Sequence, residues 1–185
     1  MAHGGQETEI KLRMADVKTA RQMLVGAGFR VSKRRVFEVN IIYDTAEQTL
    51  RNSSRLVRIR EAGGKGILTY KGPPAVARHK SREELEVEIA EARSMELILE
   101  RLGFCPIFRY EKYRTEYQRG NEGVAMVDEV PIGVYVELEG PPEWIDRTAA
   151  RLGFSESDYI HLSYGRLYLD WCAQRGIHPT HMVFS

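Results

Sequence analysis

The chain has 185 residues, of which 43% are hydrophobic, and its 27 Lys and Arg against 26 Asp and Glu leave a formal net charge of +1. This length accommodates one domain with a sizeable core, and the balanced charge argues against a general nucleic-acid-binding surface, which normally carries a basic excess. The sequence has no apolar run long enough to span a bilayer, no signal-peptide pattern and only two cysteines. We therefore expect a cytoplasmic protein without a membrane partner.

Strands outnumber helices along the chain, and short turns between strands favour antiparallel pairing. Strands are expected at 6–14, 29–44 (one long strand or a pair), 54–61, 66–72, 82–91, 105–118, 123–130 and 134–140. Helices are expected from the N-cap Asp16 to Gly26–Gly28, from Ser94 to Gly103, over Pro141–Leu152 and over Ser163–Gln174. A basic loop with two prolines covers 73–81. Residues 1–175 are expected to form a single domain. Residues 176–185 lack periodicity and are expected to form a C-terminal tail, which is either loose or contacts a partner.

Charged side chains recur at two-residue spacing in most of these strands. The acidic pairs are Glu7/Glu9, Glu86/Glu88 and Glu137/Glu139; the basic pairs are Arg58/Arg60 and Lys112/Arg114, with Lys11 continuing the first acidic pair and Lys71 alone on a short strand. Because strand side chains alternate between faces, each pair projects to one side of its strand. The positions between them, such as Ile10, Ile59 and Leu138, are apolar.

Two arrangements would explain this alternation. In an ordinary half-buried sheet the apolar face lies in the core and the charges lie in water. However, like charges on neighbouring sites of one face repel each other, so their grouping favours a site where metal ions neutralise the acids and a polyanion neutralises the bases. An antiparallel sheet of about eight strands, closed into a barrel, would place such charges around a lumen and leave its apolar outer face for the helices to cover.

The same motifs, in their order along the chain, resemble the CYTH superfamily, the triphosphate tunnel metalloenzymes that include class IV adenylyl cyclases and thiamine triphosphatases. Glu7-Thr8-Glu9-Ile10-Lys11 matches the Glu-x-Glu-x-Lys signature of that superfamily. Arg58-Ile59-Arg60, Lys71, Glu86-Val87-Glu88, Lys112-Tyr113-Arg114, Asp128 and Glu137-Leu138-Glu139 follow in order. The resemblance covers Glu7 to about Asp170 and implies an α+β fold: an eight-stranded antiparallel β-barrel, the triphosphate tunnel, with a charged lumen and helices packed outside.

Three sets of side chains receive roles from the resemblance and from their chemistry. Mg²⁺ or Mn²⁺, which prefer oxygen ligands, would be held by Glu7, Glu9, Glu137 and Glu139. The triphosphate would be bound by Lys11, Arg58, Arg60, Lys71, Lys112 and Arg114, since Arg forks engage phosphate oxygens in pairs. The candidate catalytic residues are Glu86, Glu88 and Asp128, which could bind a second metal, hold a basic residue in position or orient an attacking water.

The first functional hypothesis is a triphosphate phosphohydrolase acting on tripolyphosphate, on ATP or another nucleoside triphosphate, or on thiamine triphosphate. The second is an adenylyl cyclase. The sequence of the cyclase branch is resembled by two stretches, Tyr43-Asp44-Thr45 and Thr69-Tyr70-Lys71-Gly72-Pro73. Arg166 stands where the thiamine triphosphatase branch is expected to use Lys, which argues against that substrate. A non-catalytic module that binds polyphosphate or nucleotide is a third hypothesis, and the resemblance allows a homodimer.

Overall fold

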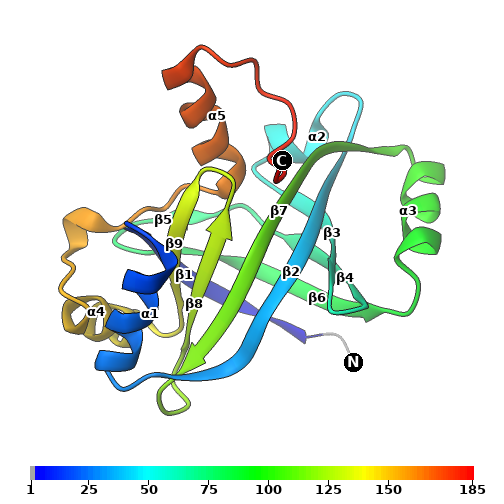
Figure 1. Ribbon diagram of the computed structural model, residues 1–185. Helices are drawn as coiled ribbons and strands as arrows, with labels where there is room; N and C mark the ends of the chain where they lie inside the picture. The colour runs from blue at the N-terminus through cyan, green and yellow to red at the C-terminus, as the bar shows by residue number, and fades with distance from the viewer. Residues whose placement is uncertain (1–2) are drawn as a thin grey trace.

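The computed structural model describes residues 3–185, which form one closed antiparallel sheet with helices around it (Figure 1). The strands are β1 His3–Met14, β2 Arg30–Thr45, β3 Leu56–Ala62, β4 Lys65–Lys71, β5 Ala75–Val76, β6 Lys80–Ile89, β7 Phe104–Gln118, β8 Val124–Val130 and β9 Gly133–Glu139. Their order is β1-β9-β8-β7-β2-β3-β4-β6, with the short β5 paired to β6. The expected eight-stranded barrel is confirmed, and β5 is a short addition to it.

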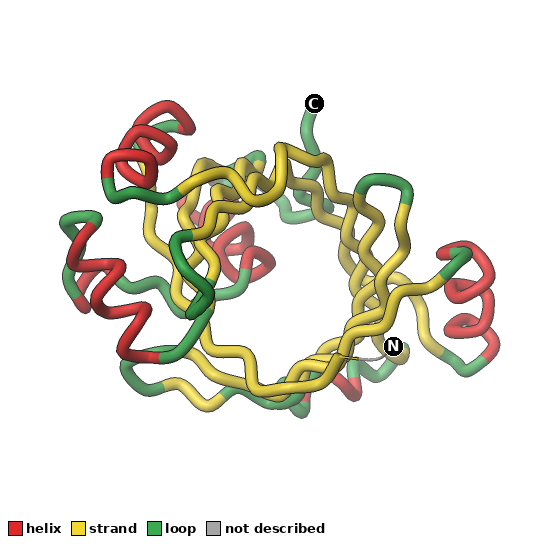
Figure 2. Tube along the Cα trace, turned by 90° about the horizontal axis from the view of Figure 1, so that it is seen from below, coloured by secondary structure: helices red, strands yellow, loops and turns green. Residues whose placement is uncertain are grey.

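Strand β1 closes the barrel because it pairs with strands on both of its sides. Glu9 lies opposite Glu139 of β9, and Glu7 lies opposite Arg82 of β6. Figure 2 looks into the resulting ring of strands and shows the helices on its outside. Closure removes the free sheet edges that would otherwise be open to pairing with another chain, and it gives the sheet an inner and an outer face.

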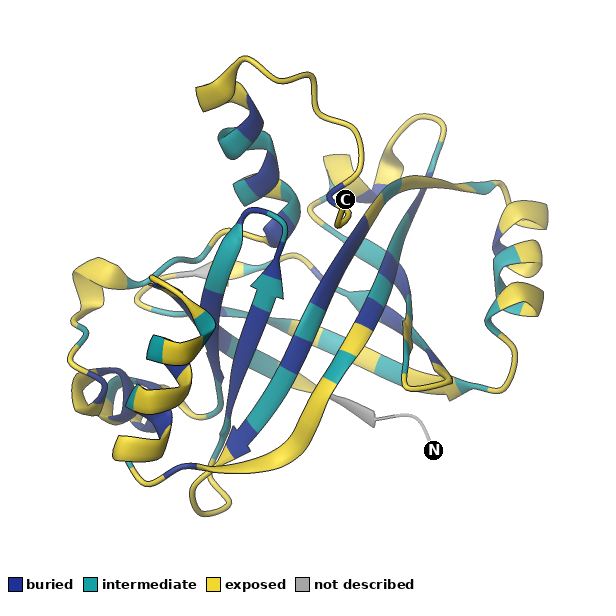
Figure 3. Ribbon diagram, viewed as in Figure 1, coloured by how far each residue is buried: buried dark blue, intermediate teal, exposed yellow. Residues whose placement is uncertain are grey.

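The apolar core lies between the outer face of the barrel and the helices. The helices are α1 Val17–Gly26, α2 Thr49–Asn52, α3 Ala92–Arg101, α4 Pro142–Arg151, the 3-10 helix η1 Glu156–Asp158 and α5 Tyr164–Arg175. Ile10, Leu12 and Leu138 of the sheet pack with Leu24 of α1 and Ile145 of α4, and all five are fully buried. In Figure 3 these helices are exposed on the side that faces away from the barrel. The apolar alternate positions of β1 and β9 therefore face the helices, as the pattern predicted, whereas Leu85 and Val87 of β6 are exposed.

Most element boundaries agree with the prediction. The segment 29–44, expected as one long strand or a pair, is one long strand, β2. The starts of one helix and one strand differ. The helix α3 begins after Glu91 rather than at Ser94, whose hydroxyl instead donates to the Glu91 carboxylate at 2.9 Å. Strand β6 begins at Lys80, inside the predicted loop 73–81, because residues from Lys80 onward pair with β1. Asp16 and Ser163 do cap their helices, by accepting from the backbone N–H groups of Thr19 and Arg166.

The last ten residues lie against the barrel. The Met182 N–H donates to the Arg109 carbonyl at 3.0 Å, and the Glu111 N–H donates to the Met182 carbonyl at 2.9 Å. The Met182 side chain is 1% exposed in a cluster with residues of α5, and the Phe184 ring packs 5.3 Å from that of Tyr113. Met182 is thus paired with the edge of β7 at Tyr110, before the part of that strand that pairs with β8.

Within the described residues, no helix combines the length and the apolar character that crossing a membrane would require.

Candidate functional site

The lumen contains a cavity of about 250 Å³ whose wall is predominantly charged. Its acidic side chains are Glu7, Glu9, Glu84, Glu86, Glu116, Glu137 and Glu139. Its basic side chains are Lys11, Arg58, Arg60, Lys71, Lys80, Arg82, Lys112 and Arg114. They lie at alternate positions of β1, β3, β4, β6, β7 and β9, so the pleat of each strand directs them inward.

The acids of β1 are paired with lysines. Lys71 Nζ donates to both carboxylate oxygens of Glu7, at 2.7 and 2.6 Å. Glu9 accepts from Lys11 at 3.1 Å and from Lys80 at 2.5 Å. Burial by itself would raise the pKa of Glu9, but the ammonium groups of Lys11, Lys80 and Lys71 lower it to about 2. Glu9 is therefore an ionised acceptor throughout the physiological pH range.

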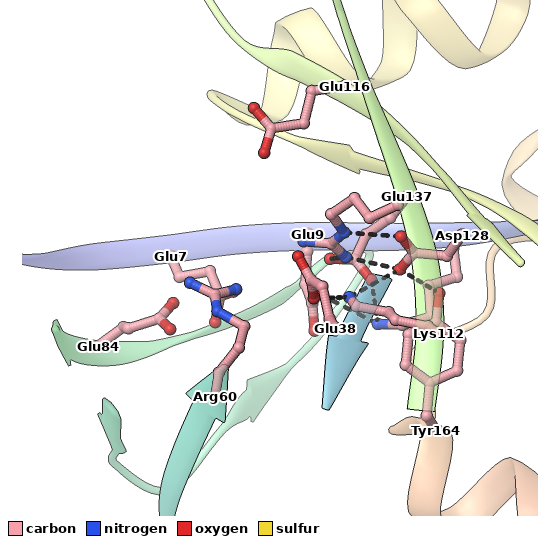
Figure 4. Close-up of polar contacts among 12 residues, drawn as sticks. Glu7, Glu9, Glu38, Arg60, Glu84, Lys112, Glu116, Asp128, Glu137 and Tyr164 are labelled. Atoms are coloured by element: carbon pink, nitrogen blue, oxygen red, sulfur yellow. Dashed lines mark hydrogen bonds and ion pairs between the residues drawn. The ribbon is translucent and has the colours of Figure 1, made fainter. Parts of the chain in front are cut away.

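A second cluster joins β7, β8 and β9 to the start of α5 (Figure 4). Asp128 is fully buried and accepts from Lys112 at 3.0 Å, from two nitrogens of Arg114 at 2.6 Å each, and from the Tyr164 hydroxyl at 2.8 Å. Arg114 also donates to Glu137 at 3.1 Å. Asp128 thus has no free face toward the cavity and holds the two basic side chains that line it.

A third cluster lies on β3, β4 and β6. The Glu86 carboxylate accepts from Arg58 and Arg60, both at 3.3 Å, and from the Thr69 hydroxyl at 2.7 Å. Burial by itself would raise the pKa of Glu86, but Arg60, Thr69 and Arg58 lower it. Glu86 therefore stays ionised and aligns the two guanidinium groups along the lumen.

The structure brings together nearly all of the residues predicted from sequence. Eleven of the thirteen candidates line the cavity, and Asp128 lies directly behind two of them. Glu88 lies apart: its side chain is 60% exposed at the end of β6 and forms an ion pair with Lys65 at 3.0 Å. The charged pair of β6 that faces the cavity is Glu84 and Glu86.

Several lumen residues escaped the sequence analysis. Lys80, Arg82 and Glu84 continue the alternation of Glu86 backwards along β6. Arg82 and Glu84 already lie in the predicted strand 82–91 but were not grouped with Glu86, whereas Lys80 lies in the predicted loop. Glu38 of β2 is 2% exposed and lies 3.5 Å from Lys112. It was missed because no charged residue stands two positions away from it in the sequence. Tyr164 belongs to a helix rather than a strand, and only the folded chain brings it to the lumen.

Tyr164 reaches the lumen because its segment is attached to β1. Lys11 and Ile160 exchange two backbone hydrogen bonds, of 3.0 and 2.9 Å, and α5 begins four residues later, at one end of the barrel (Figure 1). The Tyr164 ring then lies 5.3 Å from Lys11 Nζ and 5.5 Å from Lys112 Nζ. Within the described chain, the aromatic rings that line the cavity are those of Tyr164 and Tyr110, whose hydroxyls bond to Asp128 and Arg58.

Two carboxyl groups of the lumen resist ionisation. Burial and the neighbouring carboxylates of Glu7 and Glu137 raise the pKa of Glu139 to about 7. Burial and Glu7 raise the pKa of Glu84 to about 8, against the opposing effect of Lys71. A divalent cation between such carboxylates would relieve their repulsion.

The donor chemistry of the lumen fits a hard cation, although the side chains are not gathered around one. Glu7, Glu9, Glu137 and Glu139 offer only carboxylate oxygens, the donors that Mg²⁺ and Mn²⁺ prefer. Among residues 3–185, no three acidic, histidine or cysteine side chains converge closely enough to enclose an ion. Lys71 and Lys11 instead bond to the carboxylates of Glu7, Glu9 and Glu137.

Comparison with known proteins identifies relatives of the whole barrel. A profile described as the CYTH domain matches residues 5–164. A Methanocaldococcus jannaschii protein that has been proposed to be an adenylate cyclase is 31% identical over 133 residues, which are 72% of this chain and 75% of that protein.

Solved structures share the fold. The PH1819 protein of Pyrococcus horikoshii is 25% identical with a TM-score of 0.77, over 89% of this chain and 99% of that one. HpAC1 of Hippeastrum, a proposed adenylyl cyclase with a dominant triphosphatase activity, is 19% identical with a TM-score of 0.64, over 94% of this chain and 97% of that one.

Proposed function

This chain belongs to the CYTH domain family, and from that premise we propose that it is a metal-dependent phosphohydrolase whose substrate is a triphosphate bound inside the barrel. The observation that carries the proposal is the density of basic groups around one small cavity. Eight Lys and Arg side chains line about 250 Å³, which suits a compact polyanion with many oxygens. Inorganic triphosphate is such a ligand.

The present ion pairs indicate how the site would accept this ligand. Lys71 neutralises Glu7, and Arg58 and Arg60 neutralise Glu86. A triphosphate entering with a divalent cation would exchange these partners, since phosphate oxygens take the cationic side chains and the metal takes the carboxylates. The lumen would remain electrically balanced, which limits the cost of burying so many charges.

The lumen residues would have the following roles. Lys11, Arg58, Arg60, Lys71, Lys112 and Arg114 would bind the phosphate oxygens, and Lys80 and Arg82 extend this set on β6. Glu7, Glu9, Glu137 and Glu139 would hold Mg²⁺ or Mn²⁺, which would supply positive charge to phosphate oxygens while phosphate is transferred. Asp128 would keep Lys112 and Arg114 aimed into the cavity. Because this preorganised charge does most of the catalytic work in such reactions, no covalent enzyme intermediate is required.

The lining of the cavity favours hydrolysis over cyclisation. An adenylyl cyclase needs a surface for adenine, and the aromatic lining of the cavity within the described residues consists of Tyr110 and Tyr164, the second of which has Lys11 and Lys112 over its ring. The remaining apolar lining is small: Leu56, Val124 and Met126. The triphosphatase activity of HpAC1, which has the same fold, is compatible with this choice.

The alternative candidate is an adenylyl cyclase that converts ATP to cyclic AMP and pyrophosphate. It is favoured by the M. jannaschii relative, which is 31% identical and has been proposed to have that activity. Both candidates need the same phosphate and metal groups. They differ in the nucleophile, which is water in one and the ribose 3′-hydroxyl in the other.

Phosphorus NMR separates the two candidates. Purified protein would be incubated with inorganic triphosphate and, separately, with ATP, each with Mg²⁺ or Mn²⁺. We expect orthophosphate from inorganic triphosphate. Pyrophosphate and cyclic AMP from ATP would instead establish the cyclase, and no product from either substrate would contradict the enzymatic proposal.

A further inference from the structure

Residues 180–184, which we call the strap, lie beside strand β7 after the chain has returned from the end of α5 (Figure 1). The Met182 N–H donates to the Arg109 carbonyl at 3.0 Å, and the Met182 carbonyl accepts from the Glu111 N–H at 2.9 Å. These two bonds lie on either side of Tyr110, which faces Met182 in a parallel bridge. The strap is therefore attached to β7 at the position of Tyr110.

The strap covers a part of β7 that β8 does not reach. Strand β8 pairs with residues 113–118 of β7, and β2 pairs with the opposite edge of residues 109–112. Backbone groups in a buried wall need hydrogen-bond partners, and the strap provides them for Arg109 and Glu111. It thus completes the barrel wall beside Tyr110 and Lys112, which both line the cavity.

Side chains hold the strap in this place. Met182 is 1% exposed and belongs to the same buried cluster as Tyr110 and Tyr164. The Phe184 N–H donates to the Glu111 carboxylate at 3.1 Å. Residues that face each other across paired strands project to the same side of the sheet, so the Met182 side chain lies on the side from which Tyr110 faces the cavity. The position of Tyr110 therefore depends on Met182.

Tyr110 connects the strap to the phosphate-binding set. Its hydroxyl accepts from Arg58 Nη1 at 3.2 Å, while Arg58 Nη2 donates to Glu86 and to the Thr69 hydroxyl. A phosphate chain would compete with the Glu86 carboxylate for Arg58, because both are anions. It would not replace the neutral Tyr110 hydroxyl in the same way. Since a guanidinium binds phosphate through a planar fork, the bond to Tyr110 fixes the plane that Arg58 presents.

We propose that the strap is a positioning element of the site: it holds Tyr110, and Tyr110 orients Arg58 toward the phosphate chain. This inference rests on the proposed binding of a triphosphate. The strap lies beyond residues 5–164, which the CYTH profile matches. A segment outside that profile, and outside the charged motifs of the sequence, thereby contributes to substrate binding.

A buried charge tests the strap, because an aspartate is not stable at a fully buried apolar position and would release the segment from β7. Met182→Asp should raise the Kd for inorganic triphosphate about threefold or more, as part of the effect of disturbing a hydrogen bond to a charged group. Calorimetry without metal measures this change. Val183→Asp is the matched control, since Val183 is the next strap residue but is 39% exposed. It adds the same charge and should change the Kd less than about twofold, because solvent screens an exposed charge.

A second pair of variants separates positioning from a general loss of stability and serves if Met182→Asp does not fold. Met182→Ala shortens the side chain without adding a charge and should weaken binding in the same direction. Met14→Ala makes the same change at a methionine that is 7% exposed in the cluster beneath α1 and α4. Both variants should be less resistant to urea. Only Met182→Ala should bind inorganic triphosphate more weakly.

Two measurements test whether the strap acts through Tyr110. In a double-mutant cycle, Tyr110→Phe should weaken binding by itself, and the further change Met182→Ala should then alter the Kd less than about twofold. In a crystal structure of either Met182 variant, the Tyr110 hydroxyl should lie beyond hydrogen-bond distance of Arg58 Nη1. This second measurement needs no ligand.

The outcomes separate the two proposals. If the natural protein binds no inorganic triphosphate, with or without Mg²⁺, the proposed function fails and the crystal structure decides whether the strap positions Tyr110. Three results would overturn the strap proposal alone: Met14→Ala weakens binding as much as Met182→Ala, the effects of Tyr110→Phe and Met182→Ala add, or the bond between Tyr110 and Arg58 persists in the Met182 variants.

Discussion

Lys71 of β4 and Glu7 of β1 are joined by two hydrogen bonds, of 2.7 and 2.6 Å, across the intervening strand β6. From sequence, one was expected to bind phosphate and the other to bind metal. In the lumen these two side chains are instead each other's partners. A phosphate chain that binds Lys71 would compete with the Glu7 carboxylate.

Replacing Lys71 should weaken binding of the phosphate chain. A hydrogen bond to a charged group contributes about 1.5–3 kcal/mol, so Lys71→Met should raise the Kd for inorganic triphosphate about 10–100-fold in calorimetry without metal. Lys65→Met is the control, because the Lys65 side chain is 64% exposed and pairs with Glu88 at the end of the barrel. Unchanged affinity of Lys71→Met would remove Lys71 from the site.

Replacing Glu9 should separate metal use from phosphate binding. Glu9→Gln keeps the shape of the side chain but loses the charge that would attract Mg²⁺, so turnover should fall by about 10²-fold or more. Binding of inorganic triphosphate without metal should persist, because the basic side chains are unchanged. The comparison is Glu83→Gln, an exposed acid of the same sheet. Full turnover by Glu9→Gln would show that the metal lies elsewhere.

The pKa of Glu84 predicts how stability depends on pH. Burial and Glu7 raise this pKa from 4.5 to about 8. Between these values the folded protein keeps a proton that the unfolded chain has released, so the resulting stabilisation is complete below pH 4.5 and is lost as pH rises through 8. In EDTA, we expect the free energy of unfolding to fall by about 1 kcal/mol or more between pH 6 and pH 9, or about 2–4 °C in Tm.

Glu84→Gln should reduce this fall without abolishing it, since the raised pKa of Glu139 acts in the same direction. Glu83→Gln should leave the pH dependence as it is. Stability that rises over this range in the natural protein would show that Glu84 is ionised in the folded state.

Asp128 should prove more important for stability than its distance from the cavity suggests. Asp128→Asn would leave Lys112 and Arg114 buried without their common counter-charge, and removing one partner of a buried ion pair typically costs about 3–5 kcal/mol. Urea denaturation measures this loss. A variant that stays as stable as the natural protein yet loses turnover would instead give Asp128 a direct part in the chemistry.

Much of the fold follows from short-range patterns in the chain. Alternation at Glu7, Glu9 and Lys11 defines one charged face of β1, and Ile10 and Leu12 define the opposite apolar face. Asp16 and Ser163 mark the starts of α1 and α5. These features depend on residues within a few positions of each other, so eight strands and the direction of their charges could be predicted.

The tertiary structure decided which charges meet. Lys71 reaches Glu7, and Asp128 gathers Lys112, Arg114 and Tyr164, because barrel closure and strand register bring together positions far apart in sequence. The same register places Glu84 in the lumen and Glu88 at the end of β6, although both fit the alternation. Glu38 and Asn40 belong to no charged pair in the sequence, so the burial of these two side chains, Glu38 beside Lys112, appears only once β2 stands between β3 and β7. The sequence by itself determined which face of each strand is charged, because side-chain direction is a local property of the backbone. Only the closed barrel decided the partners, because pairing depends on the register between distant strands.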